Sequence, residues 1–280
     1  MHYPEILSIQ PKPEEFAYDD RFTMLYALGV GVGAAREDLQ YVYEKDLKAL
    51  PTMAVLMANA AGAFIEQGGI DYSMIVHGEQ RLTIHAPLPP TGRMTSQARC
   101  LGVVDKGAKA GALVHIESVI SDAVTGAPHA TTIMTLFCRG DGGFSGPTDG
   151  ALPLEDVPDR EPDMEIVLPT LPQQAALYRL LGDRNPLHID PDIATSVGFP
   201  GPILHGLCTY GIACRAVIQG CCDGDPNRIG SFDVRFSSPV FPGETVVTRI
   251  WRDDDRIAFE CHVAERGKTV IRNGSCKLRG

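Results

Sequence analysis

The chain has 280 residues, of which 44% are hydrophobic and 21% are charged, and its mean hydropathy is -0.03. A single domain typically has roughly 100–200 residues, so this length predicts one large domain or two modest ones. The composition excludes a disordered chain, a coiled coil and a bundle of membrane helices. The formal net charge of -10 argues against a polyanion such as DNA or RNA as the main partner.

The eight cysteines predict neither a zinc ribbon nor a disulfide framework, because the sequence has no Cys-x-x-Cys pair and no His-rich segment beside them. The start of the chain lacks a charged segment followed by an apolar one, and residues 277–280 are not a peroxisomal address of the Ser-Lys-Leu type. The richest apolar stretch, 53–65, is too short and too interrupted to cross a membrane. We therefore expect a cytoplasmic protein without a membrane partner.

Two related halves are predicted from a pattern that occurs twice. Residues 140–172 are rich in glycine, proline and acidic residues and have little periodicity, which is typical of a linker. Strand-like alternation of apolar and polar residues is clearest over 257–263 and recurs over 114–120. The turn motif at 87–92, Pro-Leu-Pro-Pro-Thr-Gly, resembles Pro-Val-Phe-Pro-Gly at 239–243. The predicted division is a first domain over 1–145, a linker over 146–168 and a second domain over 169–280.

Each half also contains an apolar segment with helical spacing. In the second half, Leu207, Cys214 and Ile218 share one face, and Gly220 is the predicted stop. In the first half, Pro51 fits a helix start, and the predicted apolar face consists of Met53, Leu56, Met57, Ala60 and Phe64. Periodicity therefore supports an α+β protein in which one helix packs against each sheet.

The segment 178–190 carries the clearest chemical signal. Pro186 disfavours helix at the preceding residue, so a bend is expected between Asp183 and His188, and Asp190 is placed to cap a short helix. A bend can direct a carboxylate and an imidazole at one water molecule. Such a pair can move protons to and from the water, as its addition to an activated double bond requires. The alternative is an ordinary turn whose polar side chains cap nearby backbone groups.

A second segment, 199–206, leads into the apolar helix of the second half. It places the backbone N–H of Gly206 at a helix N-terminus, where free amide donors and the helix dipole favour negative charge. Such a donor can bind an oxyanion that develops during a reaction. The presence of this donor beside the bend weakens the ordinary-turn interpretation.

The sequence at 181–191, Leu-Gly-Asp-Arg-Asn-Pro-Leu-His-Ile-Asp-Pro, and at 202–209, Pro-Ile-Leu-His-Gly-Leu-Cys-Thr, resembles the hydratase signature of the MaoC-like, (R)-specific type-2 enoyl-CoA hydratases. The first half is similar to the hydratase unit of peroxisomal multifunctional enzyme type 2 at 26–31, 77–80, 105–107 and 142–144. The resemblance implies a double hot-dog fold, in which an antiparallel sheet wraps around a long helix in each half and the first half has lost the signature. It also implies reversible hydration of a trans-2-enoyl-CoA to a (3R)-3-hydroxyacyl-CoA.

The resemblance assigns roles to individual residues. It implies that Asp183 and His188 hold the water, that Asn185 supports them, and that the Gly206 amide binds the thioester oxygen. Glu44 matches a glutamate that the family requires for activity, although on the residues alone a solvated carboxylate is the better interpretation. The family also matches seven substrate contacts. On the residues alone, His77 can be an ordinary strand histidine and Lys106 a lysine in a surface turn, and for Phe236 a core aromatic is equally natural. These contacts are His77, Gly78, Lys106, Arg184, Pro186, Leu187 and Phe236.

The combined prediction is a hydro-lyase that acts on acyl-CoA thioesters, uses no metal or organic cofactor, and forms a homodimer. In the expected mechanism, Asp183 or His188 removes a proton from the water as oxygen attacks C3, and the other protonates C2. The sequence leaves open which of the two is the base, and which acyl chain is bound. Two other functions are a thioesterase, since the hot-dog fold also hosts thioester hydrolysis, and a catalytically silent acyl-CoA binding protein. Retention of Asp183, Asn185 and His188 together favours hydration.

Overall fold

The structure is a computed structural model that describes residues 1–58, 61–253 and 256–279. Among these residues, ten strands form one antiparallel sheet in the order β1-β3-β4-β5-β2-β7-β10-β9-β8-β6. The strands are β1 (Glu14–Tyr18), β2 (Ile75–Ile84), β3 (Gly92–Asp105), β4 (Ala112–Asp122), β5 (Pro128–Cys138), β6 (Met164–Pro169), β7 (Ile229–Phe236), β8 (Thr245–Arg252), β9 (Ile257–Val263) and β10 (Lys268–Leu278).

The strand order is symmetric about the contact between β2 and β7, with β1 to β5 on one side and β6 to β10 on the other. The turns at 87–92 and 239–243, which resemble each other in sequence, join β2 to β3 and β7 to β8 at equivalent places. β6 begins at Met164, inside the segment 146–168 that the sequence predicts as a linker, and it pairs with β8. The second half of the sheet therefore begins before residue 169.

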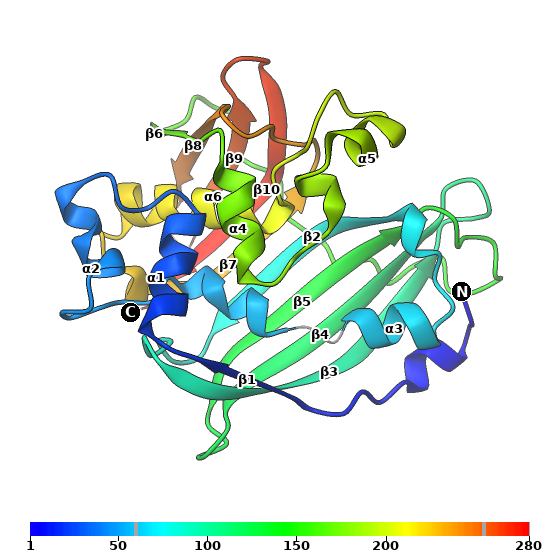
Figure 1. Cartoon of the computed structure of the whole chain (residues 1–280). Helices are drawn as coiled ribbons and strands as arrows, with labels where there is room; N and C mark the ends of the chain where they lie inside the picture. Colours follow the sequence, from blue (N-terminus) through cyan, green and yellow to red (C-terminus); the bar gives the residue numbers. More distant parts are fainter. Residues whose placement is uncertain (59–60, 254–255, 280) are drawn as a thin grey trace.

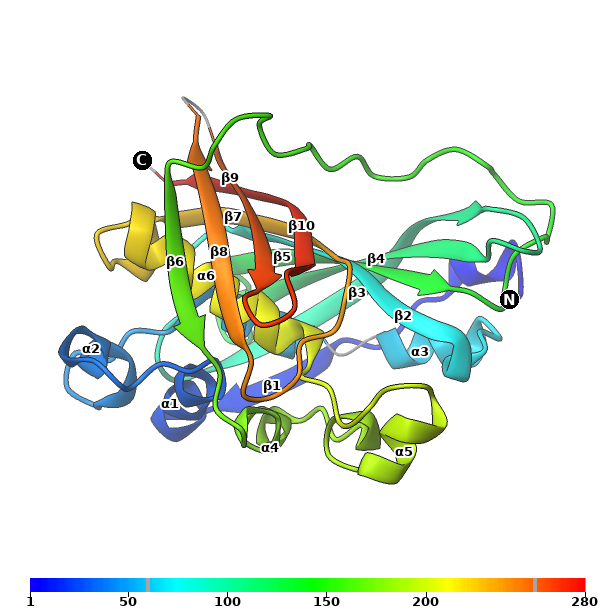
Figure 2. The ribbon, with the colours of Figure 1, turned by 90° about the horizontal axis from the view of Figure 1, so that it is seen from above.

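Helical segments lie on one side of the sheet, where α1, α4 and α5 are seen together, and the chain that connects β5 to β6 crosses the opposite side (Figures 1 and 2). The α-helices are α1 (Asp20–Gly29), α2 (Leu39–Val42), α3 (Ala61–Gln67), α4 (Gln174–Tyr178), α5 (Pro191–Ser196) and α6 (Gly206–Cys221). The 3-10 helices are η1 (Glu5–Ser8), η2 (Arg36–Asp38), η3 (Pro51–Met57), η4 (Tyr72–Met74), η5 (Arg179–Leu181), η6 (Pro186–His188) and η7 (Pro226–Arg228).

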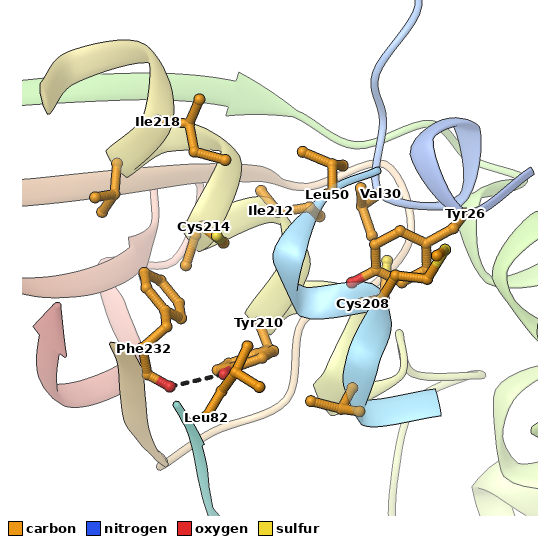
Figure 3. Close-up of a cluster of buried hydrophobic side chains, with 14 of the residues drawn as sticks. Tyr26, Val30, Leu50, Leu82, Cys208, Tyr210, Ile212, Cys214, Ile218 and Phe232 are labelled. Atoms are coloured by element: carbon orange, nitrogen blue, oxygen red, sulfur yellow. Dashed lines mark hydrogen bonds between the residues drawn. The ribbon is translucent and has the colours of Figure 1, made fainter. Parts of the chain in front are cut away.

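α6 is the long apolar helix predicted for the second half, and it begins at Gly206 as expected. Its side chains are buried in the main core, where the Tyr210 hydroxyl donates a 2.7 Å hydrogen bond to the carbonyl oxygen of Phe232 (Figure 3). Gly220 does not end the helix, which continues to Cys221. A Cβ at Gly220 would lie 2.7 Å from the sulfur of Met164, so this glycine permits close packing against β6 rather than acting as a stop.

The single helix predicted for the first half is wrong, because the structure has two separate pieces there, η3 and α3. Ala60, one of the predicted face residues, lies outside the described residues. Met53 and Met57 of η3 belong to the same core as α6, whereas Phe64 of α3 packs in a second core with Ile6. The segment is therefore divided between two cores, and one straight helix does not serve both.

In each half the antiparallel sheet curves around a helical segment, which is the arrangement expected of two hot-dog units joined edge to edge (Figure 1). Apolar residues of β4 and β9 that alternate in the sequence are buried, including Val114, Ile116, Phe259 and Cys261. Within the described part of the chain, no helix combines the length and the apolar character needed to cross a membrane.

The packing of α6 against α1 predicts the effect of a single methyl group. A Cβ at Gly211 would lie 2.5 Å from Cγ1 of Val30 and 3.0 Å from the Tyr26 hydroxyl oxygen. We expect Gly211→Ala to lower the free energy of unfolding by about 1–3 kcal/mol in urea denaturation, because overpacking displaces well-ordered neighbours. Gly62→Ala in α3 is the control, since a Cβ there meets nothing within 4 Å. Wild-type stability of Gly211→Ala would contradict the packing described here.

Candidate active site

The predicted bend lies between η5 and η6, and its own polar groups hold it in place. The backbone N–H of Asn185 donates to Oδ1 of Asp183 at 3.1 Å. The side-chain oxygen of Asn185 accepts a 3.0 Å hydrogen bond from the N–H of Leu187 and so caps η6. Asn185 therefore links the carboxylate to the short helix that carries His188, and the supporting role expected for it stays a prediction.

His188 is buried and has a defined tautomer. Its Nδ1 lies 2.8 Å from the carbonyl oxygen of Ile203. Because a carbonyl oxygen can only accept, Nδ1 carries the proton in the neutral ring, and Nε2 has a free lone pair. Burial lowers the pKa of His188 below the ordinary value, and this effect outweighs the Ile203 hydrogen bond and the charge of Asp183, which raise it. The imidazole is thus a neutral proton acceptor at pH 7.

Asp183 and His188 meet a third residue, His205, whose own role the sequence analysis did not identify. One ligand-type atom from each of the three residues lies within 4.8 Å of the others. The signal that could have found His205 is its position directly before Gly206. The same three side chains have the composition of a metal site. However, one ring nitrogen of each histidine already hydrogen-bonds to a backbone carbonyl, namely Nδ1 of His188 and Nε2 of His205. The expectation of a metal-free site stays a prediction.

Gly206 is exposed at the first position of α6, where the first backbone N–H groups have no partner within the helix. The ring of Phe236, at the end of β7, lies against it, because a Cβ at Gly206 would be 3.6 Å from the Phe236 ring. Phe236 in turn contacts His77 of β2, with ring centroids 5.0 Å apart in an edge-to-face arrangement. Phe236 of the second half therefore lies beside the start of α6, and His77 of the first half contacts Phe236.

His77 faces this site because β2 is irregular at Gly78. The pairing of β2 with β5 shifts by one residue between His77 and Glu79, as in a β-bulge. The shift places His77 on the α6 side of the sheet and Glu79 on the other side. Burial lowers the pKa of His77 to about 4, and its Nε2 is buried without a hydrogen-bond partner among the described residues. Gly78 is thus explained by the bulge, and no contact in the structure tests its predicted binding role.

The other predicted substrate contacts lie around this centre at different distances. Arg184 and Pro186 are exposed on the bend, and Leu187 is half-buried there. Lys106 is exposed in the turn after β3, beside a hollow formed with the 145–148 segment. Three interstrand steps separate the end of β3 from the start of β2, which amounts to about 14 Å. The structure therefore places Lys106 at the same end of the strands as the start of β2, at a distance from Asp183 and His188.

Glu44 lies in a different part of the chain from Asp183 and His188, and no contact in the structure tests the catalytic role predicted for it. Glu44 is exposed just after α2. The side chains of Tyr41 and Gln40 bind the carbonyl oxygen of Gly224, beyond the C-terminal end of α6. Gly206 is at the opposite end of this helix, whose 16 residues span about 24 Å. The length of α6 therefore separates the two positions, and the role that the family resemblance implies for Glu44 stays a prediction.

The first half has an equivalent position with different chemistry. η3 follows α1 and α2 as α6 follows α4 and α5, so Leu50 and Pro51 correspond to His205 and Gly206. Pro51 has no backbone N–H and cannot donate to an oxyanion. Leu50 is an apolar cap residue, 2% exposed. The first half therefore lacks both the donor and the imidazole.

Two family models match this chain. The model described as MaoC like domain matches residues 153–274, and the model described as MFE-2 hydratase 2 N-terminal domain matches residues 16–140. The chain is 42% identical to the 3-hydroxyacyl-thioester dehydratase Y of Mycobacterium tuberculosis, over 93% of this chain and 91% of that protein. It is 35% identical to the peroxisomal enoyl-CoA hydratase 2 of Arabidopsis thaliana, over 99% of this chain and 95% of that protein.

Solved structures agree with these relatives. A MaoC-like dehydratase from Phytophthora capsici is 35% identical, with a TM-score of 0.88 over 100% of this chain and 99% of that one. A Mycobacterium tuberculosis protein described as having a double hotdog fold is only 14% identical, with a TM-score of 0.54 over 96% of this chain and 97% of that one, and this likeness confirms the fold alone. The sequence identity to the dehydratase and hydratase relatives extends over nearly the full length of this chain. The chain therefore belongs to the MaoC-like, (R)-specific hydratase 2 family of hydro-lyases.

Proposed function

We propose that this protein catalyses reversible hydration of a trans-2-enoyl-CoA to a (3R)-3-hydroxyacyl-CoA. The observation that carries the proposal is the meeting of the Asp183 carboxylate with the His188 imidazole, beside the first amide of α6. Because the ligand-type atoms of Asp183 and His188 lie within 4.8 Å of each other, one water molecule between them can contact both groups. The (3R) configuration of the product is taken from the family.

The tautomer of His188 favours a specific path for the proton. In the hydration direction, the water oxygen bonds to C3 while Nε2 of His188 accepts one water proton, and the electron pair of the double bond moves toward the thioester oxygen. The imidazolium then returns this proton to C2, which restores both the thioester and the neutral ring. Asp183 accepts a hydrogen bond from the same water and stabilises the transient positive charge. One proton is removed and one is delivered, so no further reactant is needed.

Negative charge that develops on the thioester oxygen would be stabilised by the Gly206 amide. Removal of one such preorganised donor typically costs about 3–4 kcal/mol of transition-state stabilisation. The ring of Phe236 lies close to Gly206, and His77 of the first half contacts that ring. The exposed end of α6 leaves the donor open to a substrate carbonyl.

The first half, predicted over residues 1–145, would bind the coenzyme and the acyl chain. Lys106 and Arg184 are exposed, and each would attract the phosphates of coenzyme A through its positive charge. The end of β3, beside Lys106, and the start of β2 are about 14 Å apart. This distance suits an extended pantetheine arm between the phosphates and the thioester. The proposed reaction needs no metal and no organic cofactor. The protein is proposed to form a homodimer and to act in the cytoplasm.

The decisive experiment follows two products separately. With decenoyl-CoA, we expect loss of the enoyl absorbance without release of free thiol. Thiol release would indicate a thioesterase, and no change in either signal would indicate a silent acyl-CoA binding protein. Addition of a (3S)-specific hydroxyacyl-CoA dehydrogenase and NAD should form no NADH, because a water held on one face of C3 can form only one enantiomer. Rapid NADH formation would contradict the (3R) assignment.

Replacement of either member of the pair should abolish most turnover. We expect Asp183→Asn and His188→Ala to lower kcat by about 10²–10⁴-fold, because each removes a group that binds or deprotonates the water. The matched control is Asp190→Asn, since Asp190 caps α5 by accepting from the N–H groups of Asp192 and Ile193, and asparagine caps equally well. A kcat near wild type in a folded Asp183→Asn or His188→Ala protein would refute the assignment.

The pKa of His188 predicts the pH dependence of the reaction. Because burial holds this pKa below its ordinary value of 6.5, the acceptor Nε2 is mostly unprotonated at pH 7 and above. We therefore expect kcat/KM to be flat between pH 8 and 7 and to show an acid limb centred below pH 6.5, where the ring gains a proton. The measurement is kcat/KM for decenoyl-CoA against pH at constant ionic strength. An acid limb centred above pH 7 would contradict a buried neutral imidazole.

A further inference from the structure

The ring of His205 lies between two other rings. Its centroid is 3.7 Å from that of His188, with the ring planes inclined by 26°, and 4.9 Å from that of Tyr178. His205 is only 2% exposed, and Tyr178 is 1% exposed. The imidazole that is proposed to carry the proton thus stacks on His205, and His205 also contacts a fully buried tyrosine of α4.

His205 also holds the other member of the pair. Its Nε2 lies 3.2 Å from the backbone carbonyl oxygen of Asp183. Because this oxygen can only accept, Nε2 carries the proton in the neutral ring. One side chain therefore contacts Asp183 through a hydrogen bond and His188 through stacking, and its own backbone continues directly into Gly206.

The charged and titratable groups that face His205 favour a neutral ring. Burial, followed by the proximity of His188 and with a smaller effect of Arg179, lowers the pKa of His205 well below its ordinary value. The charge of Asp183 and its carbonyl act in the opposite direction and do not overcome burial. The Tyr178 ring contributes only its face, since its hydroxyl has no hydrogen-bond partner within the described part of the chain. A neutral His205 stacks on His188 without repelling the charge that His188 gains during the reaction.

Packing alone does not require a histidine here. The equivalent position in the first half is Leu50, which is also buried to 2% exposure and precedes η3 as His205 precedes α6. An apolar side chain is therefore sufficient for the hot-dog fold at this place. The polar nitrogen is present only in the half that contains the Asp183 and His188 pair.

We propose that His205 is a positioning residue, which fixes the His188 ring by stacking and the Asp183 backbone by its Nε2–H, so that both groups address one water molecule. This inference rests on the proposed function, because positioning has a measurable effect only if the pair performs the reaction. A small displacement of either group would lower the rate of the chemical step much more than the affinity for the substrate.

The test uses two variants of His205 and a matched control. His205→Phe keeps a ring in the stack and loses the N–H donor, and we expect kcat to fall about tenfold or more while KM stays within twofold. His205→Gln keeps an N–H donor of similar reach, and we expect it to recover part of the lost kcat relative to His205→Phe. Tyr178→Phe removes only a hydroxyl that has no partner, so we expect kcat within twofold of wild type. Circular dichroism and the melting temperature confirm that each protein is folded at the assay temperature.

The outcomes separate this inference from the proposed function. Absence of hydratase activity in the wild-type protein would refute the function. With an active wild type and an inactive Asp183→Asn, a His205→Phe protein whose kcat stays within twofold would overturn the positioning role, even if its melting temperature fell. Nitrogen-15 NMR of the unmodified protein gives an independent check. At pH 7 we expect neutral His205 with the proton on Nε2 and neutral His188 with the proton on Nδ1, and a charged ring or the opposite tautomer of His205 would overturn the proposal.

Discussion

The antiparallel pairing of β2 with β7 is the contact on which the site depends, because it joins the two halves of the sheet. Glu79 stands opposite Arg235 in this pairing, and its Oε1 accepts hydrogen bonds of 2.9 and 2.8 Å from Nε and Nη2 of Arg235. Glu79 is buried and Arg235 is exposed, and two charge-assisted hydrogen bonds to one carboxylate oxygen favour this register of the two halves. On the other side of the sheet, the same register brings His77 of β2 against Phe236 of β7, and both beside Gly206.

The second physical feature is the exclusion of water from the imidazoles. Burial lowers the pKa of His77, His188 and His205, so all three rings are neutral at pH 7. Backbone carbonyls set the tautomers of His188 and His205, so these two neutral rings present known lone pairs and need no change of protonation before a substrate binds. The Asp183 carboxylate is exposed and stays in contact with solvent, so the site combines a charged group at its mouth with proton acceptors deeper inside. This division suits a reaction in which water enters and leaves in each cycle.

The internal symmetry of the sheet explains why two related halves give a single site. Strand order and turn motifs repeat, yet the position of Gly206 is taken by Pro51 in the first half, and a proline offers no amide donor. The region around α2 uses its polar groups differently. There the carboxylate of Asp38 accepts from the backbone N–H groups of Gly33 and Ala34 and pairs with Arg215 of α6 at 3.4 Å. These contacts hold a loop against α6, so charge in this half serves the fold.

Local sequence patterns determined the features that depend on neighbouring residues. The bend at Pro186, the cap at Asp190, the start of α6 and the strand at Ile257–Val263 were all predicted, because proline geometry, side-chain capping and alternation act over a few residues. Motif resemblance added the family and the pair itself. Only the tertiary structure decided the rest. The break between η3 and α3 follows from packing into two cores. The separation of Glu44 from Gly206 follows from the length of α6. The contacts of His205 join residues whose distance in space no local pattern encodes.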